Sequence, residues 1–337
     1  IISTMMMTLI SISLYYELVE NKASILLWFA IFIIPMKGLS VKQSAVLNGL
    51  RKPVLSQLPD GILTPVVMLF VYLFFIIMGV EFTSLLLIKV LVISSVLSFF
   101  LSKLLVSRYE PKEIRLIKPK YNIQNWQRAL LPFTAMAIIS SLNAELASVI
   151  LGIMGFVESV GFFKIAMQAV TIIIISMSAI NIVTGPNIAR LYRKGDLESV
   201  QFLLTKSVRF NCISSLPIAV VFVFFGDKII TYVFGMEYLP SADILKILCI
   251  GQIVNVLMGS VGLVLNMTGN ERRSLKSLFI TLIFNVILLM ILIPSYKEIG
   301  AAISVSASLI CWNVLMAIDV YKITGLKTWF IFQNISK

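Results

Sequence analysis

The sequence predicts an all-α integral membrane protein, and three observations support this fold class. Hydrophobic residues make up 59% of the 337 residues and charged residues only 13%, against roughly 25% charged residues in soluble domains. Apolar runs long enough for tilted bilayer-spanning helices recur along the whole chain. Of the 28 basic residues, 21 fall in or beside one set of alternate loops and three in the opposite set, an asymmetry typical of multi-pass membrane proteins.

The spacing of the apolar runs predicts about ten membrane helices. They are expected at 1–18, 23–47, 62–79, 84–105, 129–151, 159–186, 208–226, 241–267, 276–294 and 299–321. Helix 23–47 has only 14 apolar residues before Lys37, too few to cross about 30 Å of hydrocarbon. It must continue towards Leu47, which places Lys37 inside the span. The basic loops and the C-terminus are expected in the cytoplasm.

The longest hydrophilic stretch divides the chain into two bundles. Residues 106–128 hold six basic residues against two acidic ones, and Pro111 and Pro119 interrupt helical continuity. We therefore expect a four-helix N-terminal bundle over 1–105, a cytoplasmic basic linker over 106–128, and a six-helix C-terminal bundle with a short tail over 129–337.

A short internal repeat relates the two bundles. Asn48 and Asn266 lie at matching helix ends, 218 residues apart, and the helix starts at Ala23 and Ser241 keep the same offset. Each helix end is followed by a short basic turn and two further helices. Repeats of this kind are characteristic of transporters. If both bundles were alike, the N-terminal one would lack its first two helices and the parent architecture would have twelve.

Helix 241–267 carries small and polar residues on one face. They recur at steps of three or four, as Gln252, Asn255, Gly259, Gly262 and Asn266. Because lipid cannot satisfy amides, this face should point into a bundle or a water-filled path. Close helix packing through the glycines would explain those two positions without any ligand.

Two consecutive helices carry opposite charges on polar faces. Glu145 lies late in helix 129–151 and Lys164 early in helix 159–186, with Gln168 one turn further along. An unpaired charge in the membrane costs several kcal/mol, so the two faces are expected to meet inside a bundle. A purely structural Glu145–Lys164 ion pair is the alternative to a role in substrate binding.

The residue types give no support to enzymatic or cofactor chemistry. The sequence has no histidine, its three cysteines lie in apolar runs, and it holds no glycine-rich phosphate loop or acidic metal pair. We expect no catalytic residue, metal or cofactor. The net charge of +12 does not indicate a nucleic-acid partner, because the basic residues cluster in alternate loops.

Several short segments together resemble the polysaccharide transporter family, the Wzx-type flippases of bacterial O-antigen and capsule units. These segments are 158–166, 186–196, 234–238, 242–255, 266–269 and 300–302. The family belongs to the multidrug/oligosaccharidyl-lipid/polysaccharide exporter superfamily. The resemblance implies two six-helix bundles around a central cavity that opens alternately to each side of the bacterial inner membrane. The implied substrate is an undecaprenyl-pyrophosphate-linked oligosaccharide amid membrane lipids, with the glycan polymerase and chain-length machinery as candidate partners.

A pyrophosphate-linked glycan needs a hydrated, cationic and hydrogen-bonding path. The candidate substrate-binding residues are Lys164, Glu145, Lys37, Gln168, Gln252, Asn255, Asn266, Arg51 and Arg272. By the repeat offset, Lys37 matches Asn255, and Arg51 and Arg272 cap the inner ends of the two repeated units. A drug antiporter of the same superfamily would favour a carboxylate-dominated cavity. A membrane glycan polymerase or ligase would need a large outer loop, whereas the longest here is 227–240.

Overall fold

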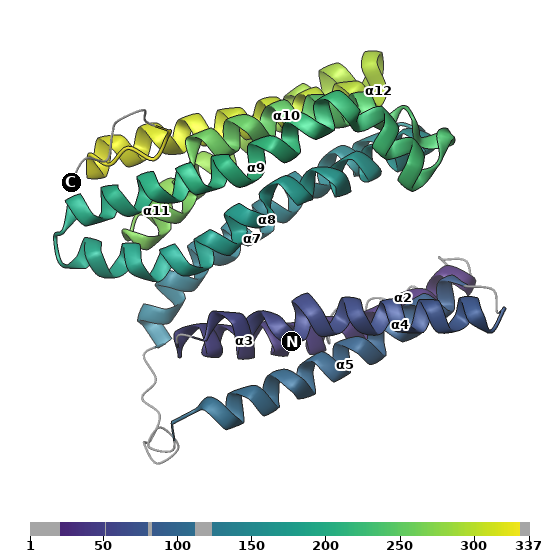
Figure 1. Ribbon diagram of the computed structural model, residues 1–337, viewed down its shortest axis with the longest axis horizontal. Helices are drawn as coiled ribbons and strands as arrows, with labels where there is room; N and C mark the ends of the chain where they lie inside the picture. The colour runs from purple at the N-terminus through teal and green to yellow at the C-terminus, as the bar shows by residue number, and fades with distance from the viewer. Residues whose placement is uncertain (1–20, 51, 80–82, 112–122, 331–337) are drawn as a thin grey trace. The chain divides into compact units, whose positions relative to one another are not determined.

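The computed structural model describes residues 21–50, 52–79, 83–111 and 123–330 (Figure 1). All regular secondary structure among these residues is helical, and seven helices are long and apolar enough to cross a membrane. The predicted fold class, a multi-pass all-α membrane protein, is confirmed. The predicted helix 1–18, Arg51 and most of the linker lie outside the described residues. The chain forms two compact units, Ile1–Lys120 and Tyr121–Lys337.

The N-terminal unit contains α2 (Asn21–Gly49), α3 (Pro53–Gln57), the π-helix η1 (Leu58–Leu63), α4 (Thr64–Ile77) and α5 (Ser84–Tyr109). α2 packs along α5, and η1 joins α3 to α4 while contacting α5. The sequence analysis predicted that the helix formed by α3, η1 and α4 begins at residue 62, which is wrong. It begins at Pro53, whose missing N–H suits a first helical turn. Asp60 therefore lies inside the membrane-spanning segment Val54–Ile77.

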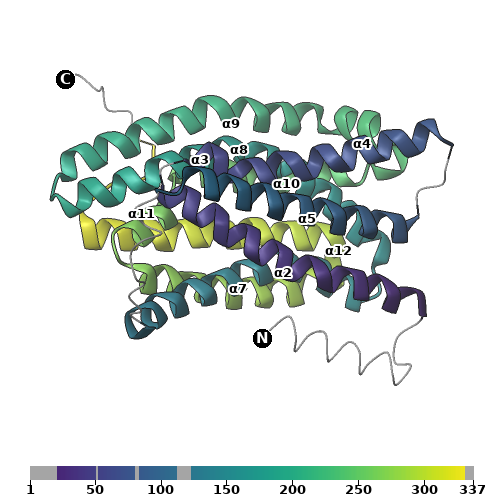
Figure 2. The ribbon, with the colours of Figure 1, turned by 90° about the horizontal axis from the view of Figure 1, so that it is seen from below.

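The C-terminal unit contains α7 (Ile123–Ile153), α8 (Val157–Arg193), α9 (Leu197–Phe234), the short 3₁₀ helix η2 (Met236–Tyr238), α10 (Ser241–Met258), α11 (Val261–Met267) and α12 (Glu271–Thr324). α10 lies between α9 and α12 and also contacts α8 (Figures 1 and 2). Gly251 permits the close approach to α12, because a Cβ added there would lie 3.1 Å from the Cα of Ser306.

α12 is a helical hairpin, not a straight helix. Its backbone breaks at Lys297, with φ 45° and ψ −124°, shortly after Pro294. Gly300 lies so close to the preceding turn that an added Cβ would be 2.4 Å from the carbonyl oxygen of Leu292. The two halves correspond to the helices predicted at 276–294 and 299–321.

α8 and α9 extend well beyond the predicted spans 159–186 and 208–226. α9 has 38 residues, about 57 Å at 1.5 Å per residue, and the hydrocarbon core is about 30 Å thick. Its start is capped by Asp196, which accepts the Ser199 N–H at 3.0 Å. Hydrogen bonds from the Ser199 side chain and backbone hold the pKa of Asp196 below its ordinary value. α8 and α9 are therefore longer than a bilayer requires, and their ends stay helical beyond the apolar runs from which the spans were predicted.

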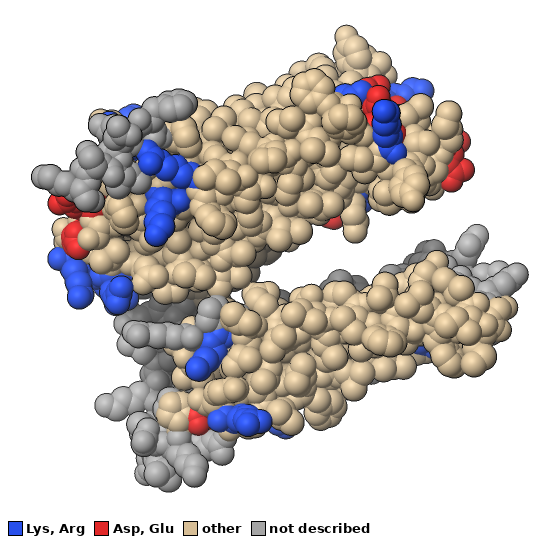
Figure 3. All heavy atoms as spheres, in the orientation of Figure 1, with Lys and Arg blue, Asp and Glu red and all other residues tan. Residues whose placement is uncertain are grey.

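Charge separates along the C-terminal unit. Figure 3 shows mainly basic side chains at the end that carries the α8–α9 turn, mixed charges at the opposite end, and mostly uncharged atoms between. This distribution fits a body that crosses a bilayer.

Candidate functional site

The helix predicted over 241–267 is broken, which corrects the sequence analysis at its most informative element. α10 ends at Met258 and α11 begins at Val261. Between them Gly259 has φ 72° and ψ −164°, a conformation open almost only to glycine. A Cβ at this position would lie 2.5 Å from Val208 and 2.6 Å from the Thr328 carbonyl oxygen. Gly259 therefore serves the break and not the packing of a continuous helix.

The segment after α12 holds this break in place. Residues 325–330, which we call the return segment, pass over the end of α10, where the Phe330 N–H donates to the Leu257 carbonyl at 2.8 Å. Gln201 of α9 donates to the Lys327 carbonyl and accepts the Lys327 N–H, both at 2.8 Å. The break is thus tied to α9 as well as to the end of α12.

Two adjoining cavities beside the break form what we call the amide crevice. Their volumes are about 220 Å³ and about 370 Å³, and they share Ser140, Leu278 and Trp312 as lining residues. Every described side chain that lines them is uncharged. The polar ones, from α7, α8, α10, α11, α12 and the break, are Ser140, Asn143, Asn181, Gln252, Asn255, Ser260, Asn266, Ser274, Thr281, Asn285, Ser308, Trp312 and Asn313.

A chain of three amides crosses the crevice. The Asn313 Nδ2 donates to Asn255 Oδ1 at 3.1 Å, and the Asn255 Nδ2 donates to Gln252 Oε1 at 3.0 Å. Asn313 itself is 1% exposed. These mutual hydrogen bonds hold the amide groups of α10 and α12 in fixed orientations.

Buried acceptors remain free in the same crevice. Asn285 donates to Asn143 at 3.2 Å, but its Oδ1 and that of Asn266 have no hydrogen-bond partner among the described residues. A buried amide oxygen without a partner costs about 1–3 kcal/mol. The crevice can therefore receive donors such as water or the hydroxyl groups of a ligand.

The structure thus brings together Gln252, Asn255 and Asn266, three of the residues that the sequence singled out. Sequence reasoning missed four other amides that line the crevice: Asn143, Asn181, Asn285 and Asn313. Their signal was the same, an amide within an apolar run. Asn143 and Asn181 stand apart from the polar positions singled out on their helices, and no polar face was singled out on the helices of Asn285 and Asn313.

Glu145 and Lys164 form an ion pair between α7 and α8. The expectation that they lie inside the bundle is wrong, because their side chains are 60% and 46% exposed, and Gln168 is exposed as well. Neither charge lines the amide crevice. Arg272 is exposed in the first turn of α12.

Lys37 is also paired. Its Nζ lies 2.5 Å from Asp60 Oδ1, and Ser98 of α5 donates to the same oxygen at 2.9 Å. Asp60 was not a candidate from the sequence, because the predicted helix began after it.

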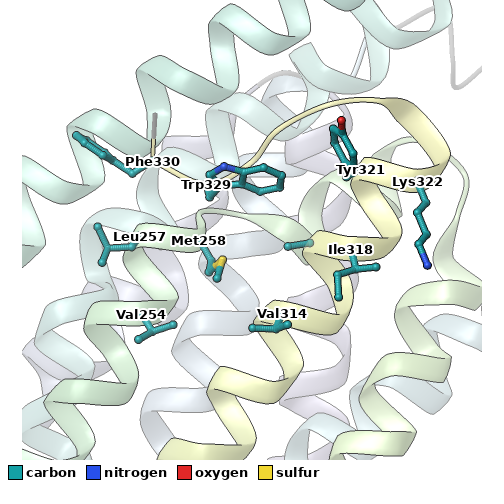
Figure 4. Close-up of a pocket in the computed structure, with 10 residues that line it drawn as sticks. Val254, Leu257, Met258, Val314, Ile318, Tyr321, Lys322, Trp329 and Phe330 are labelled. Carbon is teal, nitrogen blue, oxygen red and sulfur yellow. The ribbon is translucent and has the colours of Figure 1, made fainter. Parts of the chain in front are cut away.

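An apolar groove of about 740 Å³ lies between α10 and the second half of α12. Figure 4 shows Trp329 and Phe330 of the return segment above Val254, Leu257, Met258 and Val314, with Tyr321 and Lys322 at one side. Such a surface suits a hydrocarbon chain and offers little to a sugar. The polar and apolar concave surfaces are therefore separate in this unit.

A profile of the family described as "Polysaccharide biosynthesis protein" matches residues 1–243. The chain belongs to this family. It is 26% identical over 197 residues to "Probable low-salt glycan biosynthesis flippase Agl15" of Haloferax volcanii, which covers 56% of the chain and 41% of that protein. It is 27% identical over 230 residues to "Capsular polysaccharide biosynthesis protein CapF" of Staphylococcus aureus. This match covers 65% of the chain and 55% of that protein.

A third relative is "Uncharacterized membrane protein MJ1068" of Methanocaldococcus jannaschii, 30% identical over 142 residues, which covers 42% of the chain and 28% of that protein. The chain thus spans between 28% and 55% of the length of these relatives. The solved structure "Lipid II flippase MurJ, inward closed conformation" is similar with a TM-score of 0.68 and 16% identity, over 95% of this chain and 70% of that one. This family member therefore shares the fold of that flippase.

Proposed function

We propose that this family member translocates a lipid-linked oligosaccharide across a membrane by alternating access. The observation that carries the proposal is the amide crevice beside a broken membrane helix. Transporters commonly build substrate or ion sites where a membrane helix is discontinuous. Amides and hydroxyls can donate to and accept from sugar hydroxyls, and Trp312 adds an aromatic ring.

The charged pairs supply what the crevice lacks. A pyrophosphate needs cations, and Lys37 and Lys164 provide them on other polar surfaces of the chain. Charged side chains that faced hydrocarbon would be costly, so the exposed Glu145–Lys164 face should border a hydrated path or another protein surface. Gln168 continues that face along α8.

In its finer form, the proposed substrate is an O-antigen or capsule repeat unit on undecaprenyl pyrophosphate, moved from the inner to the outer leaflet of a bacterial inner membrane. The names of two relatives refer to glycan or capsule biosynthesis, which supports the glycan. The polyprenyl tail would stay among membrane lipids, and the glycan polymerase and chain-length machinery would receive the translocated unit.

The proposed orientation has the α8–α9 turn and the C-terminus in the cytoplasm, and the excess of basic residues in these loops supports it. We expect a Lys194→Cys variant in intact cells to resist an impermeant thiol reagent and a Glu237→Cys variant to react, in a background with Cys311→Ser. Both positions are exposed at opposite ends of α9. The reverse labelling pattern would overturn this orientation.

The glycan role is tested by removing one amide from the crevice without changing its volume. We expect Asn313→Leu to lower surface glycan in a flippase-deficient strain by about tenfold or more, because several amide hydrogen bonds near 1 kcal/mol each are lost. Lectin binding to whole cells would measure the glycan.

A matched control exists in α9. Asn211 is an equally buried amide, 0% exposed, outside the crevice and without a hydrogen-bond partner among the described residues. Asn211→Leu should leave export near the original level. Equal export by both variants, at equal protein levels, would refute a role of the crevice in glycan binding.

A further inference from the structure

Asp60 is the one acidic residue within the described helices of the N-terminal unit. It lies seven residues beyond Pro53, about 10 Å into the helix at 1.5 Å per residue, and inside a membrane-spanning segment. It also lies in a π-helical turn, a geometry often found at functional sites. A carboxylate at such a depth needs a partner, and ionisable groups there commonly mark transport pathways.

Three elements meet at this carboxylate. Lys37 of α2 contacts Asp60 Oδ1 at 2.5 Å, and Ser98 of α5 donates to the same atom at 2.9 Å. The pair is not sealed, since the Lys37 and Asp60 side chains are 35% and 28% exposed. A third group can therefore reach the ammonium without unfolding the unit.

We propose that Asp60 is a resident carboxylate which an anionic phosphate oxygen of the substrate displaces from Lys37. This inference rests on the proposed function and identifies the pyrophosphate as the group bound in the N-terminal unit. The Lys37 ammonium exchanges one anionic oxygen for another, so its own charge stays compensated throughout.

The displaced carboxylate is not left without solvation. Asp60 is 28% exposed, so water can hydrate it once its oxygen leaves Lys37.

Asp60 is the one carboxylate that can hold Lys37 within the described helices of this unit. The other charged residues whose side chains are described on α2, α3, α4 and α5 are all basic: Lys42, Lys89, Lys103 and Arg108. No second carboxylate among them competes for Lys37. A purely structural ion pair would not predict ligand displacement.

The test uses the full chain in lipid nanodiscs with undecaprenyl pyrophosphate as the probe. Asp60→Asn keeps the side-chain shape but carries no charge that competes for Lys37, so it should bind the probe about tenfold tighter than the unmodified protein does.

Two more variants complete the design. Lys37→Gln should weaken binding about tenfold through loss of the cation. Its matched control is Lys246→Gln in the C-terminal unit, because Lys246 is also 35% exposed and ion-paired, with Asp227 at 2.9 Å and Asp243 at 3.0 Å. The control should bind like the unmodified protein.

Ser98→Ala leaves both charges in place and provides a second variant should Asp60→Asn fold poorly. It removes the hydrogen bond that holds the carboxylate beside Lys37, so it should ease displacement and tighten binding about fivefold. The proposal is overturned if Asp60→Asn or Ser98→Ala matches the unmodified protein in affinity.

The two proposals fail separately. If the Lys37 and Asp60 variants bind the lipid normally while Asn313→Leu blocks glycan export, carboxylate displacement is wrong and glycan transport stands. If Asn313→Leu exports normally, the crevice has no role in transport, whatever the lipid-binding result.

Discussion

Gly259→Ala is expected to destabilise the C-terminal unit by about 3 kcal/mol or more. The added Cβ would meet Val208 at 2.5 Å and the Thr328 carbonyl oxygen at 2.6 Å, and the backbone would remain in a region that alanine avoids. The return segment would have to leave the end of α10, releasing the Phe330–Leu257 hydrogen bond. Thermal unfolding of the purified protein should show the loss, and glycan export should fall with it.

Gly262→Ala is the matched control, three residues further along the same polar face. Its Cβ would meet Met316 Sδ at 3.4 Å, an ordinary contact, and its backbone is helical. This variant should unfold close to the original temperature. If the two alanine variants unfold alike, the strained break at Gly259 is not required by the fold.

Lys164→Ala is expected to abolish glycan export while protein levels stay near normal. The Glu145–Lys164 pair is about half exposed, and exposed ion pairs contribute at most about 1 kcal/mol to stability. A bond between a charged side chain and a pyrophosphate is worth about 1.5–3 kcal/mol, so losing the ammonium should affect transport far more than folding. Lys164→Arg should retain part of the activity, since the charge persists with a different geometry.

The double variant Glu145→Gln with Lys164→Gln separates substrate binding from structural pairing. It removes both charges and keeps hydrogen-bonding capacity at both positions. A stable double variant without export supports a role in binding the substrate. A stable double variant that still exports glycan eliminates that role.

Much of the fold could be predicted because a bilayer imposes strict requirements on sequence. Each spanning helix needs a long apolar run, and the basic residues collect beside alternate ends of these runs. The predicted spans at 84–105 and 129–151 therefore lie within α5 and α7. Boundaries failed at α3, α8 and α9, because a helix can begin at a proline or continue in water without an apolar signal.

The candidate site could be predicted only one helix at a time. Periodicity placed Gln252, Asn255 and Asn266 on one face, and all three line the amide crevice. Periodicity could not reveal that Gly259 interrupts this face, because apolar residues flank the break on both sides. It also gave no reason to connect Asn255 with Asn313, 58 positions along the chain.

The sequence by itself determined the class of the protein, its helical composition and its family, because these depend on composition, on apolar runs and on short residue patterns that can be read along the chain. Only the tertiary structure decided which polar groups meet. Asp60 contacts Lys37, which lies 23 positions away in the sequence. The return segment packs against Gly259. No single run of residues encodes these contacts. Partners for buried polar groups are selected by packing, and packing is a property of the folded chain.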